Sequence, residues 1–249
     1  MLYIIQVGHN DASDRYIRNK VKAVEEAGLK VTVVNLPEET TTDLIMDKIF
    51  YCEMRHDCSA LMVQLPLPDH IDKKTVLDHI PWHLDIDGLN PGNKFKKPLT
   101  PCAIMRWFNE HSINLEGQLV TILGRSELVG KPLAEMLIDA GATVTVCNSK
   151  TDRMDRALIC DRSDIIISAV GKPGVVDIDD VNLTGIHQIV VDVGINRDEN
   201  GKLCGDVSER AREAIKSQGG ICTPVPGGVG KWTVRELVLR LKEMEGRWS

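Results

Sequence analysis

The chain has 249 residues, enough for one large domain or two small ones with buried cores. Hydrophobic residues make up 43% and charged residues 27%, a composition that is ordinary for globular proteins and excludes disordered, collagen-like and coiled-coil chains. The formal net charge of -6 argues against a protein whose main partner is a nucleic acid or an anionic membrane.

Three features of the sequence bear on where the protein works. No apolar run is long enough for a transmembrane helix, so no membrane partner is expected. The short apolar N-terminus lacks the basic region and cleavage site of a signal peptide and is typical of a strand. The seven cysteines are widely spaced and include no C-x-x-C pair, which favours reduced thiols in a cytoplasmic enzyme and argues against a zinc site.

The first part of the chain alternates between strand and helix patterns, which predicts a parallel sheet. Ser13 is expected to cap the first helix near its start, and Gly28 is expected to end it. Loop structure is expected from Asp85 to Pro101. The predicted elements are strand 2–7, helix 12–27, strand 30–36, helix 41–55 and strand 60–65.

A second alternation begins near Leu119 and indicates a domain boundary near residues 110–118. Its predicted elements are strand 119–123, helix 130–140 and strands 143–147, 165–169 and 188–193. An amphipathic helix is predicted over residues 233–244, because Leu237, Val238 and Leu241 lie on one side of it.

The segment 120–132 has the pattern of a strand, a tight turn and a helix, with G-x-S-x-x-x-G at its centre. Gly124 permits the sharp turn, and Gly130 permits a close approach of helix and strand. Ser126 stands where the common fingerprint has its middle glycine. Backbone N–H groups at the start of such a helix bind pyrophosphate, so the segment indicates a dinucleotide site. A plain strand–helix turn is the alternative.

The end of the next predicted strand bears on which dinucleotide binds. Enzymes that use NAD typically place an acidic residue there, whereas here no acid occurs before Asp152. Arg125 and Lys150 are both available to a 2′-phosphate, which is a dianion near neutral pH. The sequence therefore favours NADP over NAD, with two merely solvated basic residues as the alternative.

Tyr16 and Lys20 are four residues apart on a predicted helix, so they share a face. A lysine at the rim of a pocket can have its pKa lowered and then transfer protons. From spacing alone, a surface lysine beside a half-buried tyrosine is the simpler interpretation.

Other polar or shape-forming residues follow predicted strands. Gln64 lies at the end of a predicted parallel strand, where ligands commonly bind. Asp85 and Asp87 lie in a loop able to reach the same edge, although Asp87 is equally typical of a turn. The segment 223–230 holds three glycines and two prolines, which suits a fixed backbone against a flat ligand or, alternatively, a linker.

Taken together, eight segments closely resemble the bifunctional methylenetetrahydrofolate dehydrogenase/cyclohydrolase family. They occur in the family's order and extend over nearly the whole chain, which makes the set highly specific. The segments are SDRYIRNK (13–20), VQLPLP (63–68), DIDG (85–88), GRSELVGKP (124–132), ATVTVCNSKT (142–151), VDVGIN (191–196), GDV (205–207) and TPVPGGVG (223–230).

The resemblance implies an α/β protein of two domains with a cleft between them, the second with a Rossmann-type parallel sheet. The expected folate-binding catalytic domain spans residues 1–112 and is joined by the C-terminal helix 231–249, and the expected NAD(P)-binding domain spans 113–230. A homodimer formed through the cofactor domains is also implied. The implied activity is oxidation of methylenetetrahydrofolate to the methenyl form with NADP or NAD, followed by hydrolysis to 10-formyltetrahydrofolate at the same site.

The family's functional residues carry over onto matching positions. Lys20 would be the acid/base of the hydrolysis, and Gln64 would hydrogen-bond near it and hold its protonation state. Tyr16 would stack on the folate and Asp87 would bind the pterin. The residues expected to line the folate are Val63, Gln64, Leu65, Pro226, Gly227, Gly228, Val229 and Gly230. The residues expected to touch the dinucleotide are Gly124, Arg125, Ser126, Ser149 and Ile195.

The sequence departs from the family pattern at Leu84, at Asn148 and at Lys231–Trp232, the last of which adjoins the expected folate pocket. Three other hypotheses remain. A monofunctional dehydrogenase is disfavoured because Lys20, Gln64 and Asp87 are all retained. A paralogue that binds folate or nucleotide without turnover is the second. A dehydrogenase of the shikimate kind is the third, and segments 63–68 and 223–230 argue against it.

Overall fold

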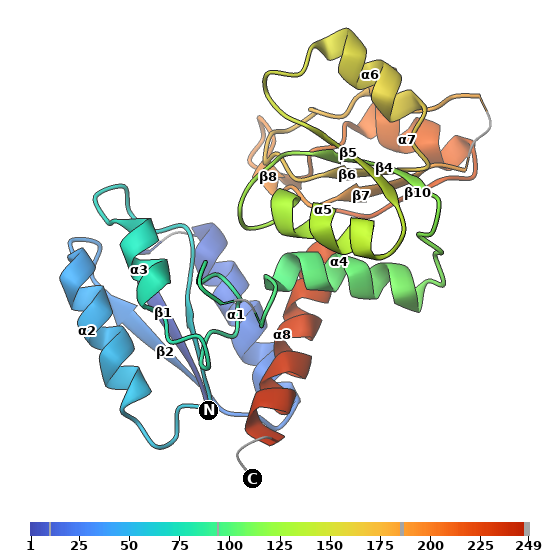
Figure 1. Cartoon of the computed structure of the whole chain (residues 1–249). Coiled ribbons are helices and arrows are strands. Elements are labelled where there is room, and N and C mark those ends of the chain that lie inside the picture. Colours follow the sequence, from blue (N-terminus) through green and yellow to red (C-terminus); the bar gives the residue numbers. More distant parts are fainter. Residues whose placement is uncertain (10, 94, 185–186, 247–249) are drawn as a thin grey trace. The chain divides into compact units, whose positions relative to one another are not determined.

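The computed structural model describes residues 1–9, 11–93, 95–184 and 187–246, and it divides the chain into two compact α/β units (Figure 1). The first unit is Met1–Leu99 together with the described chain from Val234 on, and the second is Thr100–Thr233. The division falls earlier than residue 112, because Ile104, Trp107 and Phe108 pack in the core of the second unit. The predicted α/β class with parallel sheets is confirmed.

The first unit is built on a parallel sheet with the strand order β2-β1-β3. Its strands are β1 (Leu2–Val7), β2 (Val31–Leu36) and β3 (Ala60–Val63), with Leu2 opposite both Val31 and Ala60. Its helices are α1 (Asp11–Glu26), α2 (Thr42–Glu53), α3 (Lys73–His79) and the end of α8 (Val229–Gly246). The strands are short apolar runs, so both faces of the sheet are available for burial.

Alternation along β1 sends its side chains into two cores, one on each face of the sheet. Tyr3, Ile5 and Val7 pack with residues of α2 and α3. Leu2 and Ile4 pack with residues of α1 and α8. Figure 1 shows the same arrangement, with the sheet of this unit between these two pairs of helices. The C-terminal helix is therefore part of the first unit's core.

The second unit has a five-stranded parallel sheet with the order β10-β7-β6-β4-β5. The chain runs from β4 outward to β5 and then returns to the other side of β4, which is the strand-order reversal of a Rossmann-type fold. The strands are β4 (Leu119–Leu123), β5 (Thr143–Cys147), β6 (Ile165–Ser168), β7 (Ile189–Asp192) and β10 (Ile221–Cys222).

Helices cover both faces of this second sheet. The helices α4 (Leu99–Glu110) and α5 (Gly130–Asp139) pack against Ile165 and Ile167, whereas α6 (Arg153–Asp161) and α7 (Glu209–Ser217) pack against Ile166. A small antiparallel hairpin of β8 (Asn196–Arg197) and β9 (Leu203–Cys204) follows β7. A short 3-10 helix spans Ile178–Asp180.

Several element boundaries differ from the sequence prediction. The helix α1 begins at Asp11, so Ser13 lies inside it and does not cap it. The strand β3 ends at Val63, which leaves Gln64 just beyond its carboxyl end. The helix α4 begins at Leu99, inside the stretch expected to be loop. The helix α8 begins at Val229 rather than Thr233, directly after the glycine-rich turn.

The described residues contain no disulfide, and all seven cysteines are free thiols. Within the same part of the chain, no group of three or more His, Cys, Asp or Glu side chains is arranged to hold a metal ion. No helix among the described residues has the length and apolar character needed to cross a membrane.

Candidate active site

The centre of the first candidate site is a buried lysine paired with a glutamine. The helix α1 carries Lys20, which is only 6% exposed, and its Nζ donates to Oε1 of Gln64 at 3.0 Å. The same Nζ lies 3.9 Å from Sδ of Met62 on β3. The Gln64 amide nitrogen donates to the carbonyl oxygen of Leu65 at 2.6 Å. This bond orients the amide so that its oxygen faces the lysine.

The loop that carries Asp87 is held by its neighbour Asp85, whose side chain is fully buried. The Asp85 carboxylate accepts the backbone N–H groups of Gly88, Leu89 and Asn90 at 2.9, 3.3 and 3.0 Å. Three N–H donors to one carboxylate fix the path of the chain just after Asp87. Asp85 is thus a structural support for Asp87.

The far end of the chain also supports this loop. Arg240 on α8 donates from Nη1 to the carbonyl oxygens of Ile86 and Lys97, at 2.9 and 3.0 Å. Gly88 has a φ of +68°, and a Cβ there would lie 2.5 Å from the Lys97 carbonyl oxygen. Glycine is therefore required at position 88, where the backbone of this loop passes close to the backbone of Lys97.

Burial and charge set the ionisation of the site. Burial lowers the pKa of Lys20, and the carboxylate of Asp87 partly opposes that effect. Burial likewise raises the pKa of Asp87, and the charge of Lys20 partly opposes it, while Asp85 raises it further. A lysine whose pKa is lowered can exist as the neutral amine and accept a proton. The charge of each group therefore opposes part of the effect of burial on the pKa of the other.

Tyr16 lies one helical turn before Lys20 on α1 and is half-buried. Burial raises the pKa of its phenol, so the ring stays neutral. The structure thus places Tyr16, Lys20, Gln64 and Asp87 in the same unit, with the Lys20–Gln64 bond as their direct contact. The simpler interpretation of Lys20 as a surface residue is wrong.

Two residues expected to line the folate are buried in cores. Val63 packs with the core under α2 and α3, and Val229 packs in the core of the second unit. Only their backbone atoms are therefore available to a ligand. Leu65 is half-buried beside Gln64, and the Leu65–Pro66 peptide bond is cis.

The glycine-rich segment lies in the second unit and forms a defined turn, not a linker. Gly227 has a φ of +110°, and a Cβ on Gly228 would lie 2.5 Å from the Pro224 carbonyl oxygen. Pro226 follows a cis peptide bond, and Gly230 is half-buried in the first turn of α8. The turn keeps its shape because side chains larger than hydrogen do not fit at its centre.

The predicted dinucleotide turn follows β4. Gly124 has a φ of +114°, and a Cβ there would lie 2.6 Å from the Ala169 carbonyl oxygen. A Cβ on Gly130 would lie 2.1 Å from the Gly124 carbonyl oxygen. Ser126 Oγ accepts the backbone N–H of Val129 at 3.2 Å. The turn therefore requires both glycines, and its packing fits a Rossmann dinucleotide site at the start of α5.

The remaining residues expected at the dinucleotide are exposed. Arg125, Ser149 and Lys150 are exposed, and Ile195 is 41% exposed after β7. They follow β4, β5 and β7, so all lie at the carboxyl ends of parallel strands. That edge of a doubly wound sheet is where dinucleotides bind.

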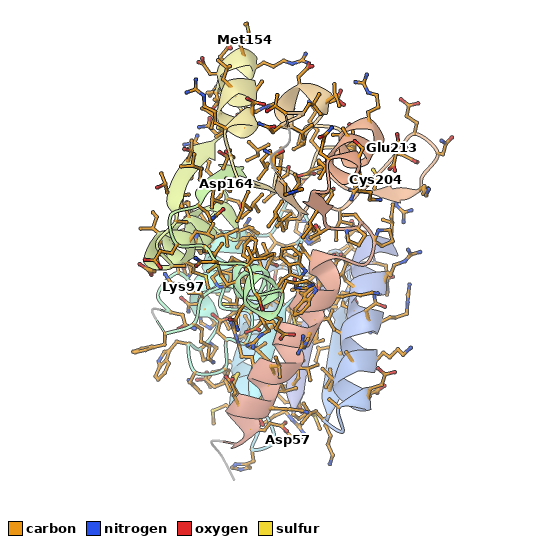
Figure 2. The ribbon with its side chains drawn as sticks, turned by 90° about the vertical axis from the view of Figure 1, so that its right-hand side faces the viewer. Asp57, Lys97, Met154, Asp164, Cys204 and Glu213 are labelled. Carbon is orange, nitrogen blue, oxygen red and sulfur yellow. The ribbon has the colours of Figure 1, made fainter. Side chains whose placement is uncertain are left out.

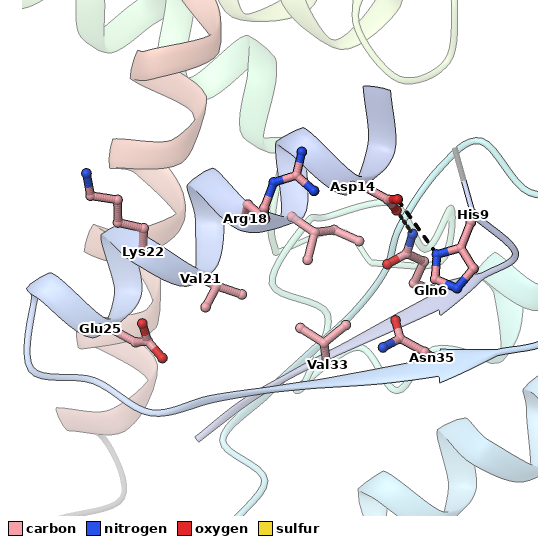
Figure 3. Close-up of a pocket in the computed structure, with 10 residues that line it drawn as sticks. Gln6, His9, Asp14, Arg18, Val21, Lys22, Glu25, Val33 and Asn35 are labelled. Carbon is pink, nitrogen blue, oxygen red and sulfur yellow. Dashed lines mark hydrogen bonds and ion pairs between the residues drawn. The ribbon is translucent and has the colours of Figure 1, made fainter. Parts of the chain in front are cut away.

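A pocket of about 400 Å³ lies elsewhere in the first unit, between α1 and β2 (Figure 3). Figure 3 shows Gln6 and His9 directed at Asp14, with Arg18 and Lys22 farther along the helix. None of the site residues expected from the sequence lines this pocket.

A Rossmann-type sheet with a glycine turn, together with a buried lysine hydrogen-bonded to a glutamine, defines a dinucleotide-dependent enzyme with a proton-transfer group. Family comparison makes this specific. The catalytic domain of tetrahydrofolate dehydrogenase/cyclohydrolase matches residues 1–87, and the NAD(P)-binding domain of the same enzymes matches residues 98–246. The chain belongs to the tetrahydrofolate dehydrogenase/cyclohydrolase family.

Curated relatives and solved structures agree with this assignment. The chain is 40% identical over 245 residues to the bifunctional protein FolD of Streptococcus pneumoniae, covering 95% of this chain and 83% of that protein. The bifunctional enzyme FolD of Campylobacter jejuni has a TM-score of 0.90 and 39% identity, over 99% of this chain and 88% of that one. The Trypanosoma brucei enzyme, solved with NADP and an inhibitor, has a TM-score of 0.88 and 33% identity, over 99% and 86%.

The chain resembles shikimate dehydrogenases in fold alone. Shikimate 5-dehydrogenase of Thermus thermophilus is 16% identical to this chain with a TM-score of 0.57, over 99% of this chain and 94% of that one. The two enzyme types share an architecture, and the site residues separate them.

Sequence reasoning missed two supports of the site. The sequence places Asp85 in a loop able to reach the same edge as Gln64 but does not indicate that Asp85 holds the loop of Asp87, and it gives no reason to single out Arg240. Asp85 had a local signal, because an aspartate followed by glycine three residues later is typical of a side-chain-capped turn. Arg240 had none, because the two carbonyl groups that it binds lie more than a hundred residues away in the sequence.

Proposed function

We propose that this protein oxidises methylenetetrahydrofolate to methenyltetrahydrofolate with NADP and hydrolyses the product to 10-formyltetrahydrofolate. The observation that carries this proposal is the buried Lys20, whose Nζ lies 3.0 Å from Gln64 Oε1 and which supports the hydrolysis step. The match to an NAD(P)-binding domain in the same chain supports the oxidation step. A dehydrogenase alone has no need of a buried lysine that titrates.

Hydrolysis of the methenyl group requires proton transfers. Water adds to an amidinium-like carbon, and a C–N bond then breaks, so one proton leaves the water and one reaches the departing nitrogen. Lys20 as the neutral amine takes the first proton and as the ammonium delivers the second. Gln64 holds the amine in place, and Asp87 binds the pterin and influences the charge of Lys20.

Oxidation depends on positioning more than on proton chemistry. Bound NADP supplies the hydride acceptor for the one-carbon bridge of the folate. The turn Gly124–Ser126 holds the pyrophosphate, and Arg125 and Lys150 pair with the 2′-phosphate. The other dinucleotide contacts are Ser149 and Ile195. Tyr16 stacks on the folate, and the remaining lining residues are Leu65, Pro226, Gly227, Gly228 and Gly230, with the backbone of Val63 and Val229.

The working form is a homodimer in the cytoplasm, joined through the cofactor-binding units. This part of the proposal is supported by the unpaired edge of β5, where Val146 is 40% exposed. On the following helix α6, Met154 and Leu158 are 76% and 58% exposed, and Figure 2 shows Met154 at the periphery. A strand at the edge of a sheet can pair with a strand of a second chain, and exposed apolar side chains beside it favour such pairing. Analytical ultracentrifugation should give twice the mass of one chain, and a monomer at micromolar concentration would contradict this.

The first experiment is an absorbance assay of the purified protein with methylenetetrahydrofolate, comparing NADP with NAD. Reduced cofactor with only transient methenyl product is the expected result. Persistent methenyl product would instead identify a monofunctional dehydrogenase. No reduced cofactor from a folded protein that is thermally stabilised by folate or NADP would identify a binding protein without turnover.

A further inference from the structure

The most heavily bonded carboxylate at the dinucleotide edge belongs to a residue with no role in the function proposed above. Asp206 follows the hairpin of β8 and β9, and its side chain is 0% exposed. It accepts five hydrogen bonds. Their donors are Ser168 Oγ at 2.9 Å, the backbone N–H groups of Val170, Gly171 and Lys172 at 2.8, 3.2 and 2.9 Å, and Asn196 Nδ2 at 2.9 Å.

These donors lie at the carboxyl ends of two neighbouring strands. Ser168 ends β6 and is followed by the loop 169–172, whereas Asn196 is the first residue of β8 and directly follows Ile195 in the loop after β7. The loop after β6 also packs on the dinucleotide turn, because a Cβ on Gly124 would lie 2.6 Å from the Ala169 carbonyl oxygen. One carboxylate therefore ties together the backbone around the expected cofactor site.

The position of Asp206 is itself fixed by a second carboxylate. Asp192, the last residue of β7, accepts the backbone N–H of Asp206 at 2.8 Å and a guanidinium N–H of Arg212 at 2.9 Å. A Cβ on Gly194 would lie 1.9 Å from Asp206 Oδ1, and a Cβ on Gly205 would lie 1.9 Å from Asp192 Oδ2. The carboxylate of Asp206 therefore fits only because residue 194 is a glycine. The carboxylate of Asp192 likewise fits only because residue 205 is a glycine.

Three successive backbone N–H groups directed at one point form a concavity that binds anions. In this protein the concavity is filled by the protein's own carboxylate. The phosphates of a dinucleotide are consequently left to the turn after β4, and the loop after β6 is held by three backbone hydrogen bonds to Asp206.

We propose that Asp206 is a positioning residue for the dinucleotide, which acts by fixing the segments 169–172 and 194–196 against the turn after β4. The inference rests on the proposed function, because it takes the dinucleotide to be NADP. It concerns the cofactor alone, so hydrolysis of supplied methenyltetrahydrofolate, which consumes no NADP, provides an internal control.

The test compares Asp206→Asn with Asp180→Asn in the full-length protein. Asp180 is a matched control, because it is 2% exposed in the same unit and accepts bonds from the Asp177 N–H and the Arg156 guanidinium. None of those donors belongs to the segments 169–172 and 194–196 or to the turn after β4. Calorimetry measures NADP affinity, and steady-state kinetics separate the KM for NADP, the kcat of oxidation and the rate of hydrolysis.

The amide of Asp206→Asn turns an N–H group toward backbone donors, so the loops shift and NADP binding should weaken by about tenfold or more. The KM for NADP should rise with it, while kcat at saturating NADP and the rate of hydrolysis stay within about twofold. Asp180→Asn should lower the melting temperature without changing NADP affinity.

A milder variant keeps the test decisive if Asp206→Asn does not fold. Asn196→Ala removes a single donor to Asp206 and should weaken NADP binding by a few-fold with hydrolysis retained. Unchanged or tighter NADP binding in a folded Asp206 variant would overturn the inference, as would equal losses of NADP binding and hydrolysis. Failure of the proposed function is a different result, namely a wild-type protein that binds NADP and does not oxidise methylenetetrahydrofolate.

Discussion

Replacement of Lys20 by Met should remove hydrolysis and leave oxidation intact. Methionine has a length similar to that of lysine. Its apolar end would lie beside the sulfur of Met62, which Lys20 Nζ contacts at 3.9 Å. What disappears is the group that transfers protons, together with its 3.0 Å bond to Gln64. Removal of a positioned acid–base group typically lowers a rate by about 10²–10⁴-fold, which corresponds to about 3–5 kcal/mol in the activation free energy.

The same substitution should destabilise the fold. It leaves the Asp87 carboxyl without the charge that partly offsets its burial, and it leaves Gln64 Oε1 without its donor. Removing one partner of a buried pair typically costs about 3–5 kcal/mol, and loss of the buried amine itself offsets part of that cost. We therefore expect a lower free energy of unfolding, seen as a melting temperature that falls by a few degrees.

Two assays and one control measure these effects. Decay of methenyltetrahydrofolate without cofactor reports hydrolysis, and NADP reduction with methylenetetrahydrofolate reports oxidation. Lys22→Met serves as the matched control, because Lys22 is an exposed lysine on the same helix. Hydrolysis by Lys20→Met within about threefold of wild type would refute the assignment of Lys20. An equal loss of oxidation would show that Lys20 acts on substrate binding instead.

Three other predictions follow from the site and the cofactor turn. Because burial lowers the pKa of Lys20, hydrolysis by the neutral amine should rise with pH and level off below the ordinary lysine value of 10.5; a pH–rate profile that rises through 10.5 would contradict this. Arg240→Leu leaves the buried Ile86 carbonyl and the partly buried Lys97 carbonyl without their donor and should destabilise the protein by about 2–3 kcal/mol, measured by urea unfolding; an unchanged midpoint would contradict the support that Arg240 is assigned for this loop. Arg125→Ala combined with Lys150→Ala should raise the KM for NADP by about tenfold or more and leave the KM for NAD nearly unchanged; parallel changes for both cofactors would show that these residues do not recognise the 2′-phosphate.

Elements with strong local patterns are predictable from this sequence. The strands β1, β4 and β5 begin and end where their apolar runs indicate, because turn-forming residues bound each run. The helix α4 is missed because its surroundings are rich in proline. Pro101 lies in its first turn, where the absent N–H group has no helical partner to lose.

The site is predictable only in part. Strand periodicity places Gln64 at the carboxyl end of β3, and the family resemblance identifies Lys20 as a functional residue. Spacing alone does not predict that Lys20 is buried, because the side chains that cover it come from other elements. Arg240 and Asp206 act through partners that are distant in sequence or on several loops, so their roles become visible only in three dimensions.

The discontinuous first unit has a consequence for the order in which the chain acquires its structure. Leu2 and Ile4 of β1 share a core with Leu237 and Leu241 of α8, whereas the second unit is one continuous stretch. Domains generally fold as units during synthesis, usually beginning with the N-terminal one. Here α1 supplies only part of the cover for that face of the sheet, and α8, which follows the whole of the second unit in the sequence, supplies the rest. We therefore expect the second unit to complete its fold before the first unit does.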